Sequence, residues 1–289
     1  MKPAPFDYVV PATIEEALEH LDRGAGDATI LAGGQTLMPL LALRMSTPGI
    51  IIDINRIPEL QGLSRGEGAT RMAPMTRQNV ALASSDLATA LPMLTRALSH
   101  VGHFQTRNRG TVGGSISLGE PAAELPATAV ALGAEIEAHS LNGSRRIPAE
   151  EFYIGPYATV LEPDELVTAI HFPDWAKGSI TVFHEVARRP GDFALVGLVG
   201  AITLDQGRIA RVGLAWFGMG PTPIKSAQAE AALMGQDPAS IDWKELAAMA
   251  VSETDPFEDH SASADYRRSV GRSIFARTLP GALNQGAKA

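Results

Sequence analysis

The chain is organised around residues 29–44, which read T-I-L-A-G-G-Q-T-L-M-P-L-L-A-L-R. Residues 29–32 have strand character and residues 37–43 are apolar, so a strand is expected to meet a helix at Gly33 and Gly34. Glycines can adopt positive φ and let a ligand approach the backbone, whose free N–H groups attract negative charge. The junction therefore fits an anion such as phosphate. A tight turn that binds nothing is the alternative.

Outward from this junction, the sequence predicts a small α/β unit over residues 1–55. Thr13 and Glu16 have the capping-box spacing, and the apolar face that follows indicates a helix closed by Gly24. The apolar run 50–54 predicts a buried strand, and strand–helix–strand over so short a length implies a parallel crossover. The sequence contains neither the G-x-G-x-x-G dinucleotide fingerprint nor a Walker A motif.

Residues 56–175 mix short helices and strands. Helices are expected at 76–83 and 92–101, whereas 103–126 has little periodicity and is predicted to be a loop wrapping a ligand. A hairpin on an Asn-Gly turn is expected over 134–147, and a further strand over 165–172.

A domain boundary is predicted near residue 175, which divides the chain into 1–175 and 176–289. The second part reads as strands followed by helices, which is typical of an α+β domain. The strands are expected at 179–188, 194–204 and 208–217, and the helices at 226–234, 241–252 and 262 to about 279.

Composition excludes several classes of protein. A net charge of −8 argues against a nucleic-acid binder, because phosphate backbones are held mainly by Lys and Arg. With no cysteine, the chain cannot hold a cysteine-ligated zinc or iron–sulfur cluster of its own. The N-terminus lacks a signal-peptide pattern and the apolar run 193–204 is too short to span a bilayer, so a cytoplasmic protein without a membrane span is expected.

A second glycine pair, Gly113-Gly114, is a candidate to bind the same ligand as the first pair. Hydroxyl groups flank both: Thr36 beside the first, and Thr111 and Ser115 beside the second. Two such loops can hold a diphosphate from two sides through backbone groups, without Lys or Arg. A dinucleotide bound by an acidic protein fits this pattern; two coincidental turns are the competing explanation.

The sequence around both pairs resembles a known family. A-G-G-Q-T at 32–36 and T-V-G-G-S at 111–115 resemble the paired FAD-binding motifs of the medium, flavoprotein subunit of molybdenum hydroxylases, of the carbon monoxide dehydrogenase and xanthine dehydrogenase type. Further similar blocks are H-V-G-H-F-Q-T-R-N-R-G-T from His100, P-A-A-E-L-P from Pro121, E-V-A-R-R-P-G-D-F-A-L-V-G from Glu185 and S-A-D-Y-R-R from Ser263.

The resemblance implies a fold of the vanillyl-alcohol-oxidase (PCMH) type, with two α/β subdomains (1–55 and 56–175) around the flavin and a C-terminal three-stranded sheet with helices. It implies an oxidoreductase subunit that passes electrons from [2Fe-2S] clusters of a small partner through FAD to an external acceptor. A large molybdopterin partner would hydroxylate the substrate, and two such heterotrimers would associate. The missing cysteines agree with clusters held by another chain.

The resemblance also implies a set of FAD-binding residues, and no catalytic or metal-binding ones. Glu124 is expected at an adenosine ribose hydroxyl, Val101 and Val167 beside the flavin ring, and His184 where many relatives have Lys. The segment Leu118-Gly119-Glu120 departs from the His-Ala-Asp of many relatives. The expected set is Leu31, Ala32, Gly33, Gly34, Gln35, Thr36, Leu37, Val101, Thr111, Gly113, Gly114, Ser115, Glu124, Val167 and His184.

Two other functions compete with this one. A self-sufficient FAD-dependent oxidase or reductase of the same fold needs a catalytic base and often a His or Cys that binds flavin covalently; the chain has no Cys, and its C-terminal part offers no evident base. A scaffold protein without a cofactor would be indifferent to FAD. Asp192 and Tyr266 are candidates either for the flavin or for structural hydrogen bonds, and Arg107 and Arg109 for phosphate or for ordering their loop.

Overall fold

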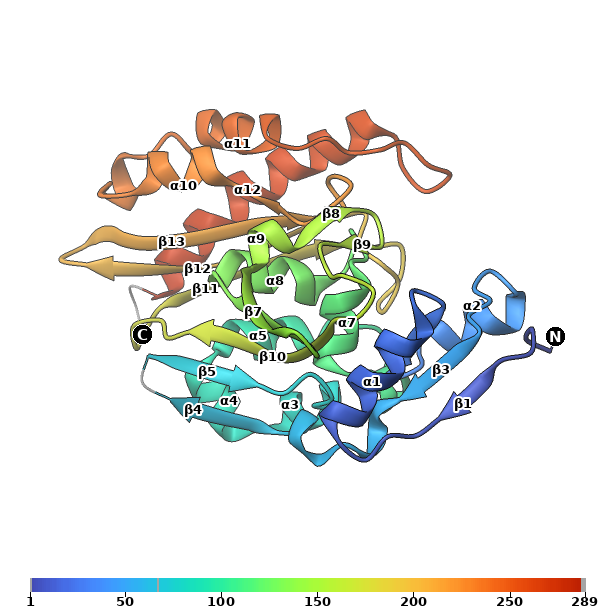
Figure 1. Ribbon diagram of the computed structural model, residues 1–289. Coiled ribbons are helices and arrows are strands. Elements are labelled where there is room, and N and C mark those ends of the chain that lie inside the picture. Colours follow the sequence, from blue (N-terminus) through green and yellow to red (C-terminus); the bar gives the residue numbers. More distant parts are fainter. Residues whose placement is uncertain (1, 67, 287–289) are drawn as a thin grey trace.

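The computed structural model describes residues 2–66 and 68–286. The predicted domains 1–175 and 176–289 therefore each extend slightly beyond the described residues: residues 1 and 67 of the first domain and 287–289 of the second lie outside them. Within that part, sheets and helical layers alternate (Figure 1). None of the described helices has the length and apolar composition needed to cross a bilayer.

The N-terminal unit is a three-stranded parallel sheet in the order β1-β3-β2. The parallel pairing expected on either side of the first glycine pair is therefore confirmed. The elements are β1 (Asp7–Val9), α1 (Ile14–Gly24), β2 (Ala28–Leu31), α2 (Leu37–Leu43) and β3 (Ile50–Asp53).

Helix α1 begins as its capping box predicts, since the Thr13 hydroxyl accepts a hydrogen bond from the Glu16 N–H at 3.2 Å. The helix ends at Gly24, but the residue that turns left-handed is Ala25, with φ of 44°. Gly24 serves packing instead, because a Cβ there would lie 2.5 Å from the Cβ of Ala28.

The middle of the chain forms a five-stranded sheet in the order β4-β5-β10-β6-β7. The hairpin predicted on the Asn-Gly turn is present as β6 and β7. Strands β4 and β5 form a further hairpin that the sequence did not reveal. The strands are β4 (Leu63–Gly66), β5 (Ala69–Met72), β6 (Glu135–Ser140), β7 (Gly143–Pro148) and β10 (Leu166–Pro173), with β8 (Tyr153–Gly155) and β9 (Ala158–Thr159) forming a separate pair.

The prediction that residues 103–126 form a loop was wrong. This segment contains α6 (Phe104–Arg109) and α7 (Val112–Leu118) and leads into α8 (Glu124–Leu132). Every residue of α8 is buried, so it has no polar face and no amphipathic period. The remaining helices of this part are η1 (Ile54–Arg56), η2 (Pro58–Leu60), α3 (Gln78–Ala83), α4 (Ser85–Ala90), α5 (Pro92–Leu98) and α9 (Ala149–Phe152).

The C-terminal part is an antiparallel sheet in the order β11-β12-β13-β14, followed by helices. Its three long strands were predicted; the fourth, β14, has only two residues and no pattern that sequence could reveal. The elements are β11 (Ile180–Val186), β12 (Val196–Asp205), β13 (Arg208–Phe217), β14 (Ile224–Lys225), α10 (Ala227–Leu233), η3 (Pro238–Ser240), α11 (Trp243–Ser252) and α12 (Ala264–Gly286).

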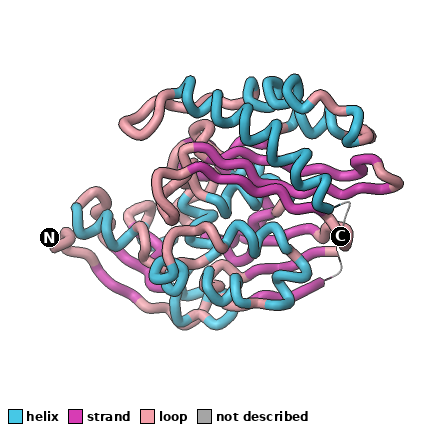
Figure 2. The backbone as a smooth tube through the Cα atoms, turned by 180° about the vertical axis from the view of Figure 1, so that it is seen from behind, coloured by secondary structure: helices cyan, strands magenta, loops and turns pink. Residues whose placement is uncertain are grey.

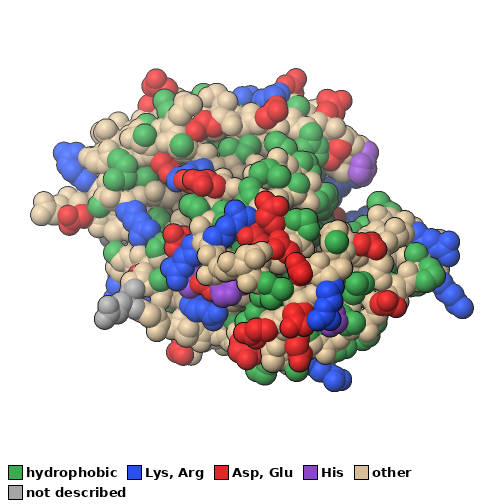
Figure 3. Space-filling view, in the orientation of Figure 1, with side chains coloured by type: hydrophobic (Ala, Val, Ile, Leu, Met, Phe, Trp, Pro, Cys, Tyr) green, Lys and Arg blue, Asp and Glu red, His purple; other side chains and the backbone are tan. Residues whose placement is uncertain are grey.

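Helices α5 and α8 lie between the five-stranded and C-terminal sheets, and α10 to α12 cover the other face of the C-terminal sheet (Figures 1 and 2). One hydrophobic core fills the space around α5 and α8, and a second lies under α10 to α12. Acidic and basic side chains are interspersed over the face in Figure 3, in which no continuous basic surface is seen.

Candidate functional site

A cavity of about 580 Å³ lies where the N-terminal unit meets the rest of the molecule. Its walls come from segments that are far apart in the sequence, among them the loop after β2, the start of α7, the start of α8, strand β10 and the loop between β11 and β12. Such convergence of loops on one concave surface is typical of a ligand site.

The structure brings the segments that carry the two glycine pairs against each other at this cavity, with each pair lying next to residues that precede the other pair. A Cβ on Gly33 would lie 2.5 Å from the carbonyl oxygen of Arg109 and 2.8 Å from the Cα of Gly110. A Cβ on Gly114 would lie 3.5 Å from the Cβ of Ala32. The absence of side chains therefore allows the two loops to approach to backbone contact.

The two loops offer different groups to a ligand. Among the described residues, the backbone N–H groups of 33–36 have no hydrogen-bond acceptor in the chain, so they are free to bind an anion. The N–H groups of the second pair are already used: Gly113 donates to the Pro74 carbonyl at 2.8 Å and Gly114 to the Thr111 hydroxyl at 3.1 Å. The first loop therefore supplies hydrogen-bond donors to a ligand, whereas the glycines of the second segment let a ligand or the first loop come close to its backbone.

A hydrogen-bond network through Asn55 and Arg77 connects the first glycine loop with the segment that precedes the second glycine pair. The sequence did not reveal this network. The Asn55 side-chain amide donates to the Ala32 carbonyl at 2.9 Å. Arg77 donates to the Asn55 side-chain oxygen at 2.5 Å and also to the Arg109 carbonyl. Burial and the neighbouring Arg109 charge lower the pKa of Arg77. Arg77 and Arg109 line an adjoining hollow of about 560 Å³ that shares the wall 32–35 with the cavity.

The charged residues that line the cavity are all acidic within the described chain: Glu120, Glu124, Glu165 and Asp192. Burial raises the pKa of Glu124 to about 8, so this carboxyl is mostly protonated at neutral pH and can donate a hydrogen bond. Glu120 accepts hydrogen bonds from the Tyr157 hydroxyl and, at 3.0 Å, from the Ala122 N–H. Within the described residues, the cavity wall therefore offers an anion backbone N–H groups and Thr and Ser hydroxyls, but no Lys or Arg side chain.

Most of the residues predicted from sequence line the cavity together. Leu31 lines only the adjoining hollow, and His184 lines neither space. Those on the cavity wall are Ala32, Gly33, Gly34, Gln35, Thr36, Leu37, Val101, Thr111, Gly113, Gly114, Ser115, Glu124 and Val167.

The loop between β11 and β12, rather than β11 itself, reaches the cavity. His184 lies within β11, and part of its surface stays exposed to solvent. Desolvation of the covered part of the ring, together with the charge of Arg96, lowers its pKa, so the side chain is neutral at pH 7. Gly191, Asp192 and Phe193 of the loop form part of the wall instead. Of these, only Asp192 was a candidate from sequence. In the sequence this run stood out only as part of the family-like block from Glu185, which did not indicate where the loop would fold.

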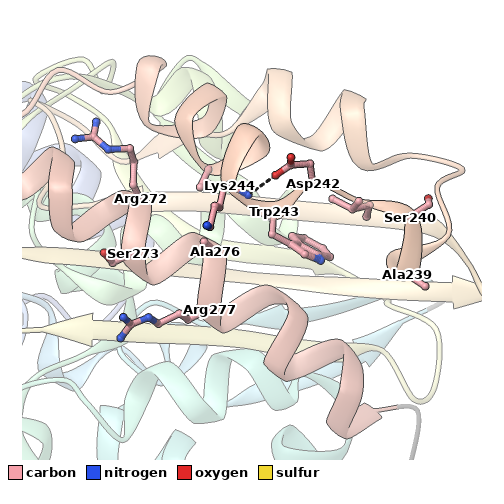
Figure 4. Close-up of a pocket in the computed structure, with 11 residues that line it drawn as sticks. Ala239, Ser240, Asp242, Trp243, Lys244, Arg272, Ser273, Ala276 and Arg277 are labelled. Carbon is pink, nitrogen blue, oxygen red and sulfur yellow. Dashed lines mark hydrogen bonds between the residues drawn. The ribbon is translucent and has the colours of Figure 1, made fainter.

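A second hollow, of about 870 Å³, lies on the outer helical layer between α11 and α12 (Figure 4). It is open and has exposed Lys244, Arg272 and Arg277 in its lining, while Asp242 caps α11 by accepting the Lys244 N–H at 2.9 Å. It contains neither glycine pair. Within the described residues, no group of three or more His, Cys, Asp or Glu side chains is arranged to hold a metal.

Comparison with known proteins identifies the family. The family described as FAD binding domain in molybdopterin dehydrogenase matches residues 4–175, and CO dehydrogenase flavoprotein C-terminal domain matches residues 181–282. The chain is 39% identical over 286 residues to the 6-hydroxypseudooxynicotine dehydrogenase complex subunit alpha of Paenarthrobacter nicotinovorans, covering 99% of this chain and 97% of that one.

Two further relatives come from Hydrogenophaga pseudoflava. The carbon monoxide dehydrogenase medium chain is 33% identical, with 96% of this chain and 97% of that one covered. The solved structure of carbon monoxide dehydrogenase lacking the Mo-pyranopterin moiety superposes with a TM-score of 0.93 at 32% identity, over 99% of both chains. These matches confirm the expected fold and cofactor, and the chain belongs to the family of FAD-binding medium subunits of molybdenum hydroxylases.

Proposed function

We propose that FAD binds in the cavity between the two glycine loops, with its diphosphate on the backbone of residues 32–37. The observation that carries this placement is the run of free N–H groups at 33–36 beside a loop held at backbone contact. A cavity of about 580 Å³ falls in the size range of cofactor sites. The residues proposed to bind FAD are the predicted ones that line the cavity. Leu31 and His184 are left out because they do not.

The chemistry of the remaining wall fits the other parts of FAD. Apolar Val101 and Val167 suit the flavin ring, and protonated Glu124 can donate a hydrogen bond to a ribose hydroxyl or accept one from it. Thr111 and Ser115 also line the cavity, on either side of Gly114, which lies next to Ala32 of the first loop. The protein thus supplies binding and orientation, while the bound flavin supplies the redox chemistry.

We further propose that this chain carries electrons from [2Fe-2S] clusters of a small partner to an external acceptor, with substrate hydroxylated at the molybdopterin of a large partner. Bound FAD can couple one-electron donors to two-electron acceptors. The chain has no cysteine to ligate a cluster itself, which supports the division of labour. A dimer of heterotrimers, a cytoplasmic location and a domain boundary near residue 175 stay predictions.

A flavin titration of the purified full-length chain tests the placement. We expect one FAD per chain, with the visible absorption spectrum of bound flavin. A folded chain that binds no flavin would refute the proposal. Turnover of a small organic substrate by the isolated chain would favour the self-sufficient oxidase instead.

The partner proposal needs its own measurement. Tagged chain isolated from its native cells should bring down one cysteine-rich small chain with iron and acid-labile sulfide, and one large chain with molybdenum. Recovery of the chain alone at native concentration, with neither metal, would contradict the proposed assembly.

A further inference from the structure

Arg267 is a buried charged residue that the flavin site does not use directly. It lies near the start of α12, its residue exposure is only 2%, and it does not line the cavity. Guanidinium groups stay charged at all relevant pH values, so burying one is costly unless its donors are well paired. Its position therefore calls for a specific role.

The guanidinium holds three oxygen atoms from separate segments. It donates to the Leu195 carbonyl at 2.5 Å, to the Gly218 carbonyl at 3.1 Å and to the Asp259 carboxylate at 3.0 Å. Asp259 is held in turn by the N–H groups of Ser261 and Ala262, at 2.7 and 2.9 Å. The carboxylate thus orients the guanidinium from its outer side.

The first carbonyl belongs to the loop that reaches the cavity. Leu195 closes the β11–β12 loop by donating its N–H to the Val186 carbonyl at 2.8 Å. Gly191, Asp192 and Phe193 of the same loop line the cavity, and Phe193 is 63% exposed there. A shift of Leu195 would therefore move this wall.

The second carbonyl connects to the opposite wall. Gly218 follows β13 and donates its N–H to the Pro121 carbonyl at 2.9 Å, between the cavity residues Glu120 and Glu124. Gly218 has φ of +70°, and a Cβ there would lie 2.8 Å from the Leu195 carbonyl oxygen. One guanidinium therefore lies at the meeting point of the two wall segments.

We propose that Arg267 is a positioning residue that sets the spacing of the 191–195 loop and the 120–124 turn, and so the shape of the FAD cavity. This inference rests on FAD occupying that cavity. Arginine suits the position because its planar fork can reach two carbonyls and a carboxylate at fixed angles, whereas the lysine ammonium is a compact charge on a flexible stem.

Arg267→Lys in the full-length chain tests the role, with Arg272→Lys on the exposed side of the same helix as the matched control. We expect the dissociation constant of FAD to rise about tenfold in Arg267→Lys and to stay unchanged in the control. Acrylamide should also quench the fluorescence of the bound flavin more strongly. A purely structural residue would lower the unfolding temperature without changing either flavin readout.

Hydrogen exchange of flavin-free protein gives a readout that is independent of cofactor binding. Amides of 191–195 and of 122–124 should exchange faster in Arg267→Lys than in the control. If Arg267→Lys does not fold, Asp259→Asn takes its place. This variant keeps the hydrogen bonds from Arg267 to the Leu195 and Gly218 carbonyls but removes the carboxylate that orients the guanidinium, so it should show the same changes to a smaller extent. Wild-type exchange in both segments, in whichever variant folds, overturns the proposal. Failure of wild-type protein to bind FAD would instead refute the placement of the cofactor.

Discussion

Gly33→Ala is the sharpest test of the contact between the two glycine loops. The added Cβ would lie 2.5 Å from the Arg109 carbonyl oxygen and 2.8 Å from the Gly110 Cα, and both neighbours are backbone atoms that cannot rotate away. Restoring ordinary van der Waals contact requires the loops to separate by roughly 1 Å, and overpacking of this kind costs about 1–3 kcal/mol.

That cost should appear mainly in cofactor binding, because the displaced backbone forms the proposed diphosphate site. At 1.4 kcal/mol per factor of ten, we expect FAD affinity to fall about 5- to 150-fold. Equilibrium titration of flavin-free protein with FAD measures it. Gly66→Ala is the matched control, since a Cβ at Gly66 meets nothing within 4 Å. Equal affinities for Gly33→Ala and Gly66→Ala would refute the close approach of the loops.

Two further predictions concern the same site. Burial raises the pKa of Glu124 from 4.5 to about 8, so the folded flavin-free protein holds a proton that the unfolded chain releases, and stability falls by about 1.4 kcal/mol per unit as pH rises between these values. Urea unfolding at pH 5 and 7.5 should show that the free energy of unfolding falls less between these pH values in Glu124→Gln than in the wild type. An equal fall in both proteins would contradict the raised pKa of Glu124. Arg77→Met leaves the Asn55 side-chain oxygen and the Arg109 carbonyl oxygen without their donor. FAD titration of this variant should show an affinity about tenfold lower than that of the wild type. An unchanged affinity would show that this hydrogen-bond network does not hold the two loops at the distance that FAD needs.

Elements with a clear period or a turn signal were predictable from sequence. The capping box of α1, the apolar run of β3 and the Asn-Gly hairpin of β6 and β7 each carry a local physical preference. Helix α8 was missed because it is buried on all sides. Helix α6 was missed because it has no buried residue and so no apolar face, and α7 because Gly113, Gly114 and Ser115 in its first turns have low helix propensity.

Residues of the cavity wall were predictable from sequence where they have an unusual local chemistry or where the family resemblance supplied them. Both glycine pairs were found because glycine allows backbone approach, and the family resemblance supplied Val101, Glu124 and Val167. Asn55 and Arg77 were not found, since each acts through a hydrogen bond to a residue more than twenty positions away. His184 was expected at the flavin, yet the cavity wall is formed by the loop after its strand.

The sequence by itself narrowed the class of ligand: two glycine pairs flanked by hydroxyl groups in an acidic chain fit a diphosphate held by backbone groups, and the family resemblance indicated FAD. The absence of cysteine places any cysteine-ligated iron–sulfur cluster on another chain. Tertiary structure alone decided which loop donates hydrogen bonds, because that depends on whether Pro74 and Thr111 already occupy the N–H groups of the second pair. It also decided the protonation of Glu124, since burial is the largest cause of the raised pKa of that carboxyl, and burial depends on how segments distant in sequence pack around it.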